Sequence, residues 1–354
     1  MFWEAGYCAG GSLPVTSAPA HTTLATVAAS AGVLVATVSK VINGRTDVDR
    51  TTRARIQKLL LQLEYFPWRA PIVKAPTIEL LFQDNLNAYC TEIMNGVLDA
   101  AADLTVPVVV SVRRQPQRKS EPAAWARDLA AAGRKAVVAV TTMLTAGDLN
   151  ALSRAGVQLV VIDVLNMPHA RVTCVGSTNF AGGVAATQHL LSLGHRRIAY
   201  VGGPASAACN QARMHGFRGT MHTAGIPVTE GYVSSEQQTY GDGVARGTEL
   251  LDLSDPPTAV LAFSDELALG VVEAARVRGF RIPADLSVVG FDDTQMARLS
   301  SPPLTTVRQP LREMGALALR TAVRLAAGAR VDFRHVELAT ELVVRGSTAP
   351  IDVG

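Results

Sequence analysis

The stretch LATVAASAGVLVATVSKVING, residues 24–44, and the stretch DVDRTTRARIQKLLLQL, residues 47–63, decide the fold of the first part of this chain. Apolar residues recur there at helical spacing, as at Leu24, Val27, Ala28 and Ala31, then Val38, Val41 and Ile42, then Ile56, Leu59, Leu60 and Leu63. Gly32 allows a turn with positive φ, Asn43-Gly44 ends the second segment, and Asp49 stands at the N-cap of the third. The pattern predicts three short helices around a small core, with an ordinary three-helix bundle as the alternative.

The second predicted helix has one narrow outward face. Its outward positions are Val35, Ala36, Ser39 and Lys40, whose side chains are small or cationic. A narrow face of this kind fits the major groove of DNA, where it can approach the base edges. The stretch therefore favours a DNA-binding module.

Composition and charge agree with a small head and a larger body. The chain has 354 residues and is 48% hydrophobic, which argues against a disordered protein. The net charge of +3 is unevenly placed, because residues 22–74 carry eight Lys and Arg against three Asp and Glu. A basic head on a mildly acidic body suits a protein whose phosphate contacts are confined to one end.

The cysteine spacing limits the possible disulfide and metal sites, and the N-terminal sequence indicates the cellular location. Cys8, Cys90, Cys174 and Cys209 form no C-x-x-C pair, and the seven histidines show no metal-ligand spacing. We expect no disulfide, no metal and no cofactor. The first residues lack the cationic and apolar regions of a secretion signal, and no apolar stretch reaches about eighteen residues. We therefore expect a cytoplasmic protein with no membrane partner.

Beyond residue 77, short apolar runs alternate with helical stretches. The predicted strands span residues 78–82, 106–112, 136–140, 159–162, 198–201, 259–262 and 286–289. The predicted helices span residues 90–103, 182–193, 211–224, 243–253, 266–278 and 312–327. This alternation predicts parallel sheets covered on both faces, and a break near residues 176–179 divides the strands into two similar sets. We expect two Rossmann-like subdomains that face each other across a cleft.

Polar residues directly follow several of these strands, where ligands of open parallel sheets bind. They are Gln83, Asp84, Thr141, Thr142, Asp163, Ser264, Asp265, Asp292 and Asp293. Asp84, Asp265 and Asp292 are the expected ligand contacts from this set. The alternatives are a cap on the following helix for Asp265 and a solvated loop for Asp163.

Several motifs with defined spacing extend along the chain. A-x-V-A-x-x-A-G-V-x-x-x-T-V-S-[RK]-V-[IL]-N occupies residues 25–43, and T-R-x-R-[IV] and L-x-Y-x-P occupy residues 52–56 and 63–67. Later come GHRRIAYVGGP at 194–204, R-x-x-G-F at 213–217, S-D-x-x-A-L-G at 264–270, SVVGFDD at 287–293 and PLTTVRQP at 303–310. In these motifs the chain closely resembles LacI-type transcription regulators, from residue 22 to residue 347. The resemblance implies an all-α helix-turn-helix head and an α/β body of two Rossmann-like parallel-sheet subdomains, the fold of periplasmic binding proteins.

Four parts of the chain are expected on this basis. They are a flexible leader (1–21), the helix-turn-helix domain (22–68), a linker (69–76) and a body for effector binding and dimerisation (77–348). The resemblance implies a hinge helix in the linker that wedges a leucine into the minor groove. Pro71 and Pro76 disfavour such a helix, so we expect a stiff, extended linker instead.

The resemblance also implies which head residues contact DNA. Val35 and Ala36 are expected against base edges, with Ser39 and Lys40 behind them. Lys40 is the main candidate for a base or phosphate contact. Thr37, Ser39, Asn43 and Thr52 can donate to phosphates, and this contact is favoured for Thr37 and Asn43. Each of these four can instead bond within its own helix. Leu34 replaces the serine that usually caps this helix, a loss worth roughly 1 kcal/mol.

For the effector, the resemblance adds four residues. It implies that Asp292 accepts hydrogen bonds from ligand hydroxyls and that Arg213 offers its guanidinium to ligand oxygens. Tyr89 is expected to stack on the ligand, and Gln309 to be a polar contact or hinge at a crossover between the subdomains. The alternatives are a solvent-facing position for Arg213 and a core position for Tyr89.

Two features of the sequence indicate the chemistry of the effector. Residues 237–240 read Gln-Gln-Thr-Tyr, where many sugar regulators carry an aromatic residue, and Tyr240 can serve there by a register shift. Arg213 is the one basic candidate for the pocket. This favours a neutral sugar or polyol over a phosphorylated ligand.

The sequence thus predicts a sequence-specific transcriptional repressor that acts as a homodimer on a near-palindromic operator and is controlled by a small molecule. One alternative is a solute-binding protein of a transporter, against which the missing secretion signal and the DNA-binding head argue. The other is an enzyme, but the chain has no P-loop, nucleophile elbow or proper G-x-G-x-x-G motif, so no catalytic residue is expected.

Overall fold

The computed structural model describes residues 24–42, 45, 47–63, 76–84, 86–113, 121–163, 172–235, 239–331 and 333–351. The contacts divide the chain into two units, residues 1–74 and 75–354, and each is described by itself. The leader, most of the expected linker, Asn43, Gly44, Tyr65 and Pro67 lie outside the described residues.

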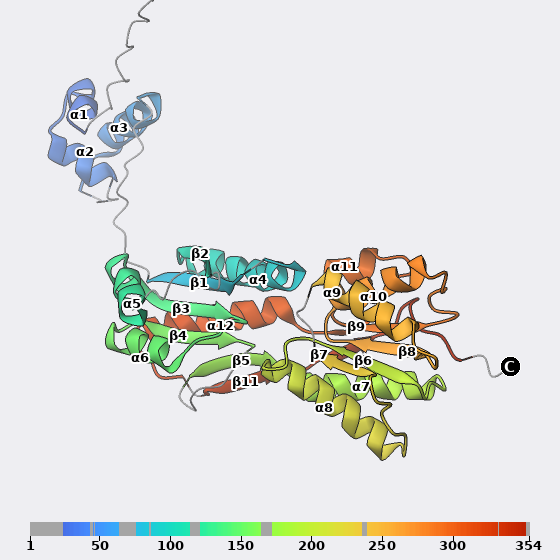
Figure 1. The fold of residues 1–354 in the computed structure, drawn as a ribbon. Coiled ribbons are helices and arrows are strands. Elements are labelled where there is room, and N and C mark those ends of the chain that lie inside the picture. Colours follow the sequence, from blue (N-terminus) through green and yellow to red (C-terminus); the bar gives the residue numbers. More distant parts are fainter. Residues whose placement is uncertain are drawn as a thin grey trace, which may run out of the picture. The chain divides into compact units, whose positions relative to one another are not determined.

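The head consists of α1 (Leu24–Ala31), α2 (Val35–Ile42) and α3 (Arg50–Gln62) (Figure 1). Its core contains the predicted stripes, with these side chains buried: Val27, Ala28, Ala31, Val38, Val41 and Ile56. Gly32 makes the turn between α1 and α2 with a φ of 62°. Asp49 caps α3, because its Oδ1 accepts hydrogen bonds from the backbone N–H groups of Thr51 at 3.0 Å and Thr52 at 2.9 Å.

The body contains two six-stranded sheets. The first has the order β11-β5-β4-β3-β1-β2, with bounds Thr77–Gln83 (β1), Val108–Arg113 (β2), Arg134–Val140 (β3), Gln158–Ile162 (β4), Thr173–Ser177 (β5) and His335–Leu338 (β11). The second has the order β12-β10-β9-β8-β6-β7, with bounds Ile198–Gly202 (β6), Val233–Ser235 (β7), Ala259–Ala262 (β8), Ser287–Asp292 (β9), Thr305–Arg308 (β10) and Glu341–Val343 (β12). Neighbouring strands run parallel except β10 and β12, which are antiparallel, so the expectation of purely parallel sheets is wrong at that edge.

Helices cover both faces of each sheet, as the alternating pattern predicted (Figure 1). On the first sheet, α4 (Ala88–Leu104) and α12 (Leu311–Ala326) share one apolar core, and α5 (Pro122–Ala131) and α6 (Ala146–Arg154) share the other. On the second, α9 (Tyr240–Leu251), α10 (Asp265–Val277) and the short α11 (Gln295–Leu299) lie over one face. The opposite face packs against α7 (Asn179–Ser192) and α8 (Ala208–Thr223).

The chain crosses between the two sheets three times. It leaves the first sheet after β5, returns through α12 and β11, and leaves again to form β12. The predicted break at residues 176–179 is therefore the first of three crossings rather than a division into two sequential halves. The crossings lie at Thr178, at Gln309-Pro310 and at Ala339-Thr340, and they join the two subdomains side by side.

Candidate functional site

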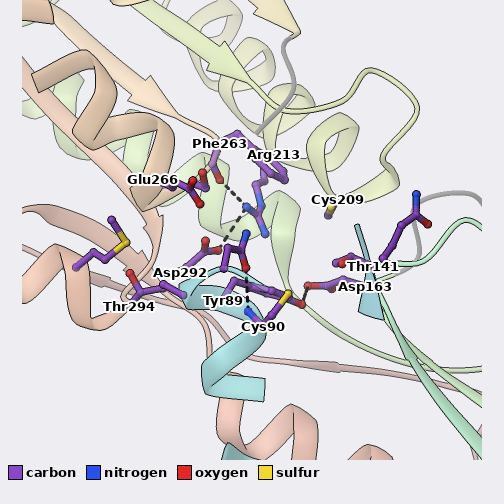
Figure 2. Close-up of a pocket in the computed structure, with 15 residues that line it drawn as sticks. Tyr89, Cys90, Thr141, Asp163, Cys209, Arg213, Phe263, Glu266, Asp292 and Thr294 are labelled. Atoms are coloured by element: carbon purple, nitrogen blue, oxygen red, sulfur yellow. Dashed lines mark hydrogen bonds and ion pairs between the residues drawn. The ribbon is translucent and has the colours of Figure 1, made fainter. Parts of the chain in front are cut away.

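A cavity opens between the carboxyl ends of the strands of both subdomains (Figure 2). It encloses about 620 Å³, counting its open mouth. Its lining from the first subdomain includes Gln83, Asn87, Tyr89, Cys90, Thr141 and Asp163. Its lining from the second includes Cys209, Arg213, Phe263, Ser264, Glu266, Asp292, Thr294 and Met296. The position of this pocket, at the strand ends of both subdomains, is where a small molecule would contact both of them.

Three lining residues adopt the left-handed backbone region as their strands end. Thr141, Asp163 and Asp292 have φ values of 43°, 47° and 114°. Residues other than glycine rarely adopt such values, and where they do so they cluster at ligand sites.

Arg213 is fixed inside the second subdomain with 2% of its surface exposed, so the solvent-facing alternative is wrong. Its Nη1 donates to the carbonyl oxygen of Phe263 at 2.6 Å, and its Nε donates to Oδ1 of Asn179 at 2.7 Å. Its Nη1 lies 3.7 Å from Oδ1 of Asp292. The guanidinium also lies over the rings of Phe263 and Phe291, 4.5 and 3.6 Å from their centroids. These contacts hold one positive charge at the wall of the cavity.

Tyr89 and Asp163 form a pair in the first subdomain. The Tyr89 hydroxyl donates to Oδ2 of Asp163 at 2.7 Å, across 74 positions of sequence. Burial raises the pKa of Asp163, and the charge of Arg213 partly opposes this rise. Burial and the neighbouring Asp163 charge hold the pKa of Tyr89 well above its ordinary value, so the hydroxyl stays protonated. The solvated-loop alternative for Asp163 is wrong, because this carboxylate is buried and bonded.

Asp292 ends β9 in the second subdomain. Its Oδ1 accepts a hydrogen bond from Nε2 of Gln309 at 2.6 Å. Burial raises the pKa of Asp292 well above its ordinary value, while Arg213 acts in the opposite direction. Gln309 itself does not line this cavity and lies behind Asp292 at the crossing into α12.

Like Gln309, two more of the expected ligand residues do not line this cavity. The buried carboxylate of Asp265 accepts hydrogen bonds from the N–H of Thr294 at 2.7 Å and from the hydroxyl of Thr306 at 2.6 Å. Asp265 therefore holds the connection after β9 in place. Ser264 is the N-cap of α10, so the helix-cap alternative for Asp265 is wrong, while a ligand contact by Asp265 stays a prediction. Asp84 is exposed after β1 and lies outside the cavity lining.

Sequence reasoning missed several residues of the lining. Glu266, Thr294, Met296 and Phe263 were not considered as contacts, although Phe263 and Thr294 closely follow strands. Cys209 was noted only for its spacing to other cysteines. Its pKa is raised to about 12 by burial, and burial raises that of Cys90 to about 11. Both thiols are therefore protonated at neutral pH and are poor nucleophiles.

In the head, α2 presents the predicted outward face. Val35, Ala36 and Lys40 are exposed, and Thr37 and Ser39 are half-buried. Leu34 precedes α2 at the N-cap position, is 77% exposed and has no oxygen with which to cap the helix. Nζ of Lys40 lies 2.7 Å from Oδ2 of Asp47, and this contact lowers the pKa of Asp47.

Two further observations concern metal and membrane. Within the described ranges, no three or more His, Cys, Asp or Glu side chains gather where they could hold a metal ion. In the same part of the chain no single helix is long and apolar enough to span a membrane. The bent pair α1 and α2, taken together, is long and apolar enough for a membrane span, by length and composition alone.

Comparison with known proteins identifies both parts of the chain. Residues 23–67 match the family of bacterial regulatory proteins called the lacI family, and residues 187–348 match the periplasmic binding protein-like domain. The regulator DegA of Bacillus subtilis is 33% identical over 338 residues, which cover 94% of this chain and 99% of DegA. CelR of Thermobifida fusca is 33% identical, with 92% of this chain and 98% of CelR covered.

Solved structures agree with this assignment. The CelR–cellobiose complex superposes with a TM-score of 0.71 at 33% identity, over 92% of this chain and 99% of that one. The Lac repressor bound to ONPG superposes with a TM-score of 0.79 at 27% identity, over 92% and 99%. This chain belongs to the lacI family of bacterial regulatory proteins and is a DNA-binding transcriptional regulator under the control of a small molecule.

Proposed function

We propose that this protein is a transcriptional repressor whose homodimer binds a near-palindromic operator, and that a neutral sugar or polyol in the cavity between its subdomains sets its affinity for that operator. The observation that carries the proposal is the set of buried polar groups around the cavity, with Asp163 from one subdomain and Asp292 and Arg213 from the other. Among relatives, CelR is known in complex with cellobiose, and the Lac repressor as a dimer bound to operator.

The polar groups suit a ligand rich in hydroxyl groups. Carboxylate oxygens accept hydrogen bonds from ligand hydroxyls, a guanidinium donates to ligand oxygens, and Tyr89 supplies an aromatic ring. Asp163, Glu266 and Asp292 together outnumber the single cation Arg213, whose Nε and Nη1 already have protein partners. A phosphate group would meet three carboxyl groups and one guanidinium that already bonds to the protein through two of its nitrogens, so we favour an uncharged effector.

Ligand binding would favour one relative position of the two subdomains. In a dimer that movement would change the spacing of the two heads and therefore their match to the operator half-sites. In each head, we propose that Val35 and Ala36 contact base edges. The proposed polar or phosphate contacts are Thr37, Ser39, Lys40, Asn43 and Thr52.

We assign the cavity a binding role and not a catalytic one, and operator binding would place the protein in the bacterial cytoplasm. The expected domain limits and the extended linker at 69–76 remain part of this proposal. A bending assay of the operator tests the linker, because a sharp central kink would contradict the loss of the hinge wedge.

The test of the effector class is a thermal-shift panel on the purified full chain. It would compare neutral sugars, including cellobiose and ribose, with their phosphorylated forms, followed by gel shifts on the promoter of its own gene. We expect a neutral sugar to raise the melting temperature and to change operator binding. Stabilisation by phosphorylated sugars alone would contradict the proposed class, and failure to bind any promoter fragment at low salt would contradict the regulator.

A further inference from the structure

Two buried residues at the crossings connect the first subdomain with the carboxylate of Asp292. Ser177 is the last residue of β5 and has no exposed surface. Gln309 follows β10, precedes α12 and is 3% exposed. The two side chains come from positions 132 residues apart in the sequence. They meet where the chain passes from one sheet to the other.

The hydrogen bonds run from Ser177 to Gln309 and from Gln309 to Asp292, with the donor named first in each case. The Ser177 hydroxyl donates to Oε1 of Gln309 at 2.5 Å. This leaves the amide nitrogen of Gln309 facing Asp292, and Nε2 donates to Oδ1 of Asp292 at 2.6 Å. The backbone N–H of Gln309 also donates to the carbonyl oxygen of Asp292, at 3.3 Å. If the Gln309 amide turned over, two oxygens would face each other at Asp292, so the Asp292 carboxylate fixes the orientation of the amide, and the Ser177 hydroxyl donates to the amide oxygen that remains.

We propose that Ser177 and Gln309 are positioning residues that couple the Asp292 carboxylate to the relative position of the two subdomains. Ser177 belongs to the first sheet and Asp292 to the second, so a rotation at the crossings changes the distance between Ser177 and Gln309. Gln309 then cannot keep both of its side-chain bonds. Because all three groups are buried, the loss of either bond is unfavourable, and the orientation of Asp292 changes with the rotation.

Asn179 also links the first crossing to the cavity, because it donates to the carbonyl oxygen of Ser177 and accepts from Arg213, but it makes no contact with Asp292 that would orient this carboxylate. The bonds between Thr178 and Thr340 do not reach the cavity. Oγ1 of Thr178 accepts a hydrogen bond from the N–H of Thr340 at 2.9 Å and lies 3.0 Å from its hydroxyl. These contacts join one crossing to another without touching a cavity residue. The path through Ser177 and Gln309 therefore differs from the general bracing of the crossings. Its regulatory meaning rests on the effector role proposed above for Asp292.

The test is a double-mutant cycle that needs neither effector nor operator. It uses full-length Ser177→Ala, Asp292→Asn and the double variant, with hydrogen–deuterium exchange measured in peptides that contain residues 177–179, 309–311 and 339–341. Asparagine is chosen because it tolerates the positive φ of Asp292 and removes the charge. We expect each single change to speed exchange at the crossings about tenfold, and the double variant to exchange no faster than the faster single variant.

A matched control uses Ser287→Ala. Ser287 is also fully buried, but it bonds to His195 and to the carbonyl of Ala349 at the start of β9, away from the crossings. When Ser287→Ala is combined with Asp292→Asn, the changes that the two substitutions cause in the exchange rate at the crossings should multiply. Exchange in β3 should stay within about twofold of the wild-type rate for every variant. The proposal would be overturned if the effects of Ser177→Ala and Asp292→Asn on the exchange rate multiplied in the double variant. It would also be overturned if Asp292→Asn left exchange at the crossings unchanged. Because no sugar or DNA is used, this outcome is independent of whether the proposed effector class is right.

Discussion

The head and the body of this chain hold their functional side chains in opposite ways. In the head, Val35, Ala36 and Lys40 are exposed on a helix whose core comes from residues close in sequence. In the body, Arg213 and Asp292 are buried, and the bonds that hold such groups join distant parts of the chain. A surface that reads DNA can be formed locally, whereas a cavity that senses a ligand depends on long-range packing. Changes in the body should therefore have larger effects on stability than changes in the head.

The largest expected effect is that of Arg213→Ala. It removes the positive charge beside two buried carboxylates and the contacts to Phe263 and Phe291. Breaking a buried ionic group of this kind lowers the free energy of unfolding by about 3–5 kcal/mol. Urea unfolding would measure the change, with exposed Arg276→Ala as the control. A loss for Arg213→Ala as small as that of the control would show that the buried network contributes little.

A somewhat smaller effect concerns pH and Asp265. Burial raises the pKa of Asp265 to about 6, so the folded state binds its proton more tightly than the unfolded chain does. This contribution to stability is complete below the unfolded value of 3.8 and is lost as the pH rises through about 6. In Asp265→Asn that loss disappears, so stability relative to the wild type should increase by about 2–3 kcal/mol between pH 4 and pH 7.

Urea titrations of both proteins across this range would measure the relative change. The absolute stability of Asp265→Asn can be lower, because asparagine cannot accept all the hydrogen bonds from Thr294 and Thr306. A difference between the two proteins that stays constant with pH would contradict the assignment.

In the head, Leu34→Ser should restore a cap to α2. The new hydroxyl can accept a hydrogen bond from the backbone of the first turn, which stabilises a helix by about 1 kcal/mol. Exchange of the α2 amides should slow by roughly fivefold in the full chain. Leu34→Ala is the control, since it removes the exposed side chain without adding an acceptor. Equal exchange in the two variants would mean that α2 is capped in another way.

The smallest effect is expected for Asp47→Asn. Asp47 pairs with Lys40 at the exposed surface, where such pairs contribute little to stability. Its removal frees Lys40 for phosphate, so binding to random-sequence duplex DNA should become steeper in salt by about one unit of slope. In a Lys40→Ala background the same change should have no such effect. An identical slope for Asp47→Asn and the wild type would count against Lys40 as a DNA contact.

The same contrast explains how far the sequence predicts the structure. The stripes from Val27 to Ile56 and the cap at Asp49 follow from local spacing, and the structure contains them. The crossing at Gln309 was expected only from the family resemblance, and the return of β11 to the first sheet was missed, because it depends on pairings such as His335 with Cys174, far apart in sequence. In the sequence, the carboxyl ends of several strands also carry the same residue type, an aspartate. Asp292 lines the cavity while Asp265 bonds to Thr294 and Thr306, and only tertiary contacts distinguish the two.

The central claim is that a ligand bound at Asp292 controls the affinity of the protein for its operator. Asp292→Ala tests this claim most directly. Calorimetry would measure binding of the neutral sugar that stabilises the wild type, and gel shifts would measure operator binding with and without it. The account predicts that sugar affinity falls by at least about 100-fold, while operator affinity without sugar stays within about threefold and no longer responds to the sugar. Wild-type sugar affinity in Asp292→Ala would contradict the account.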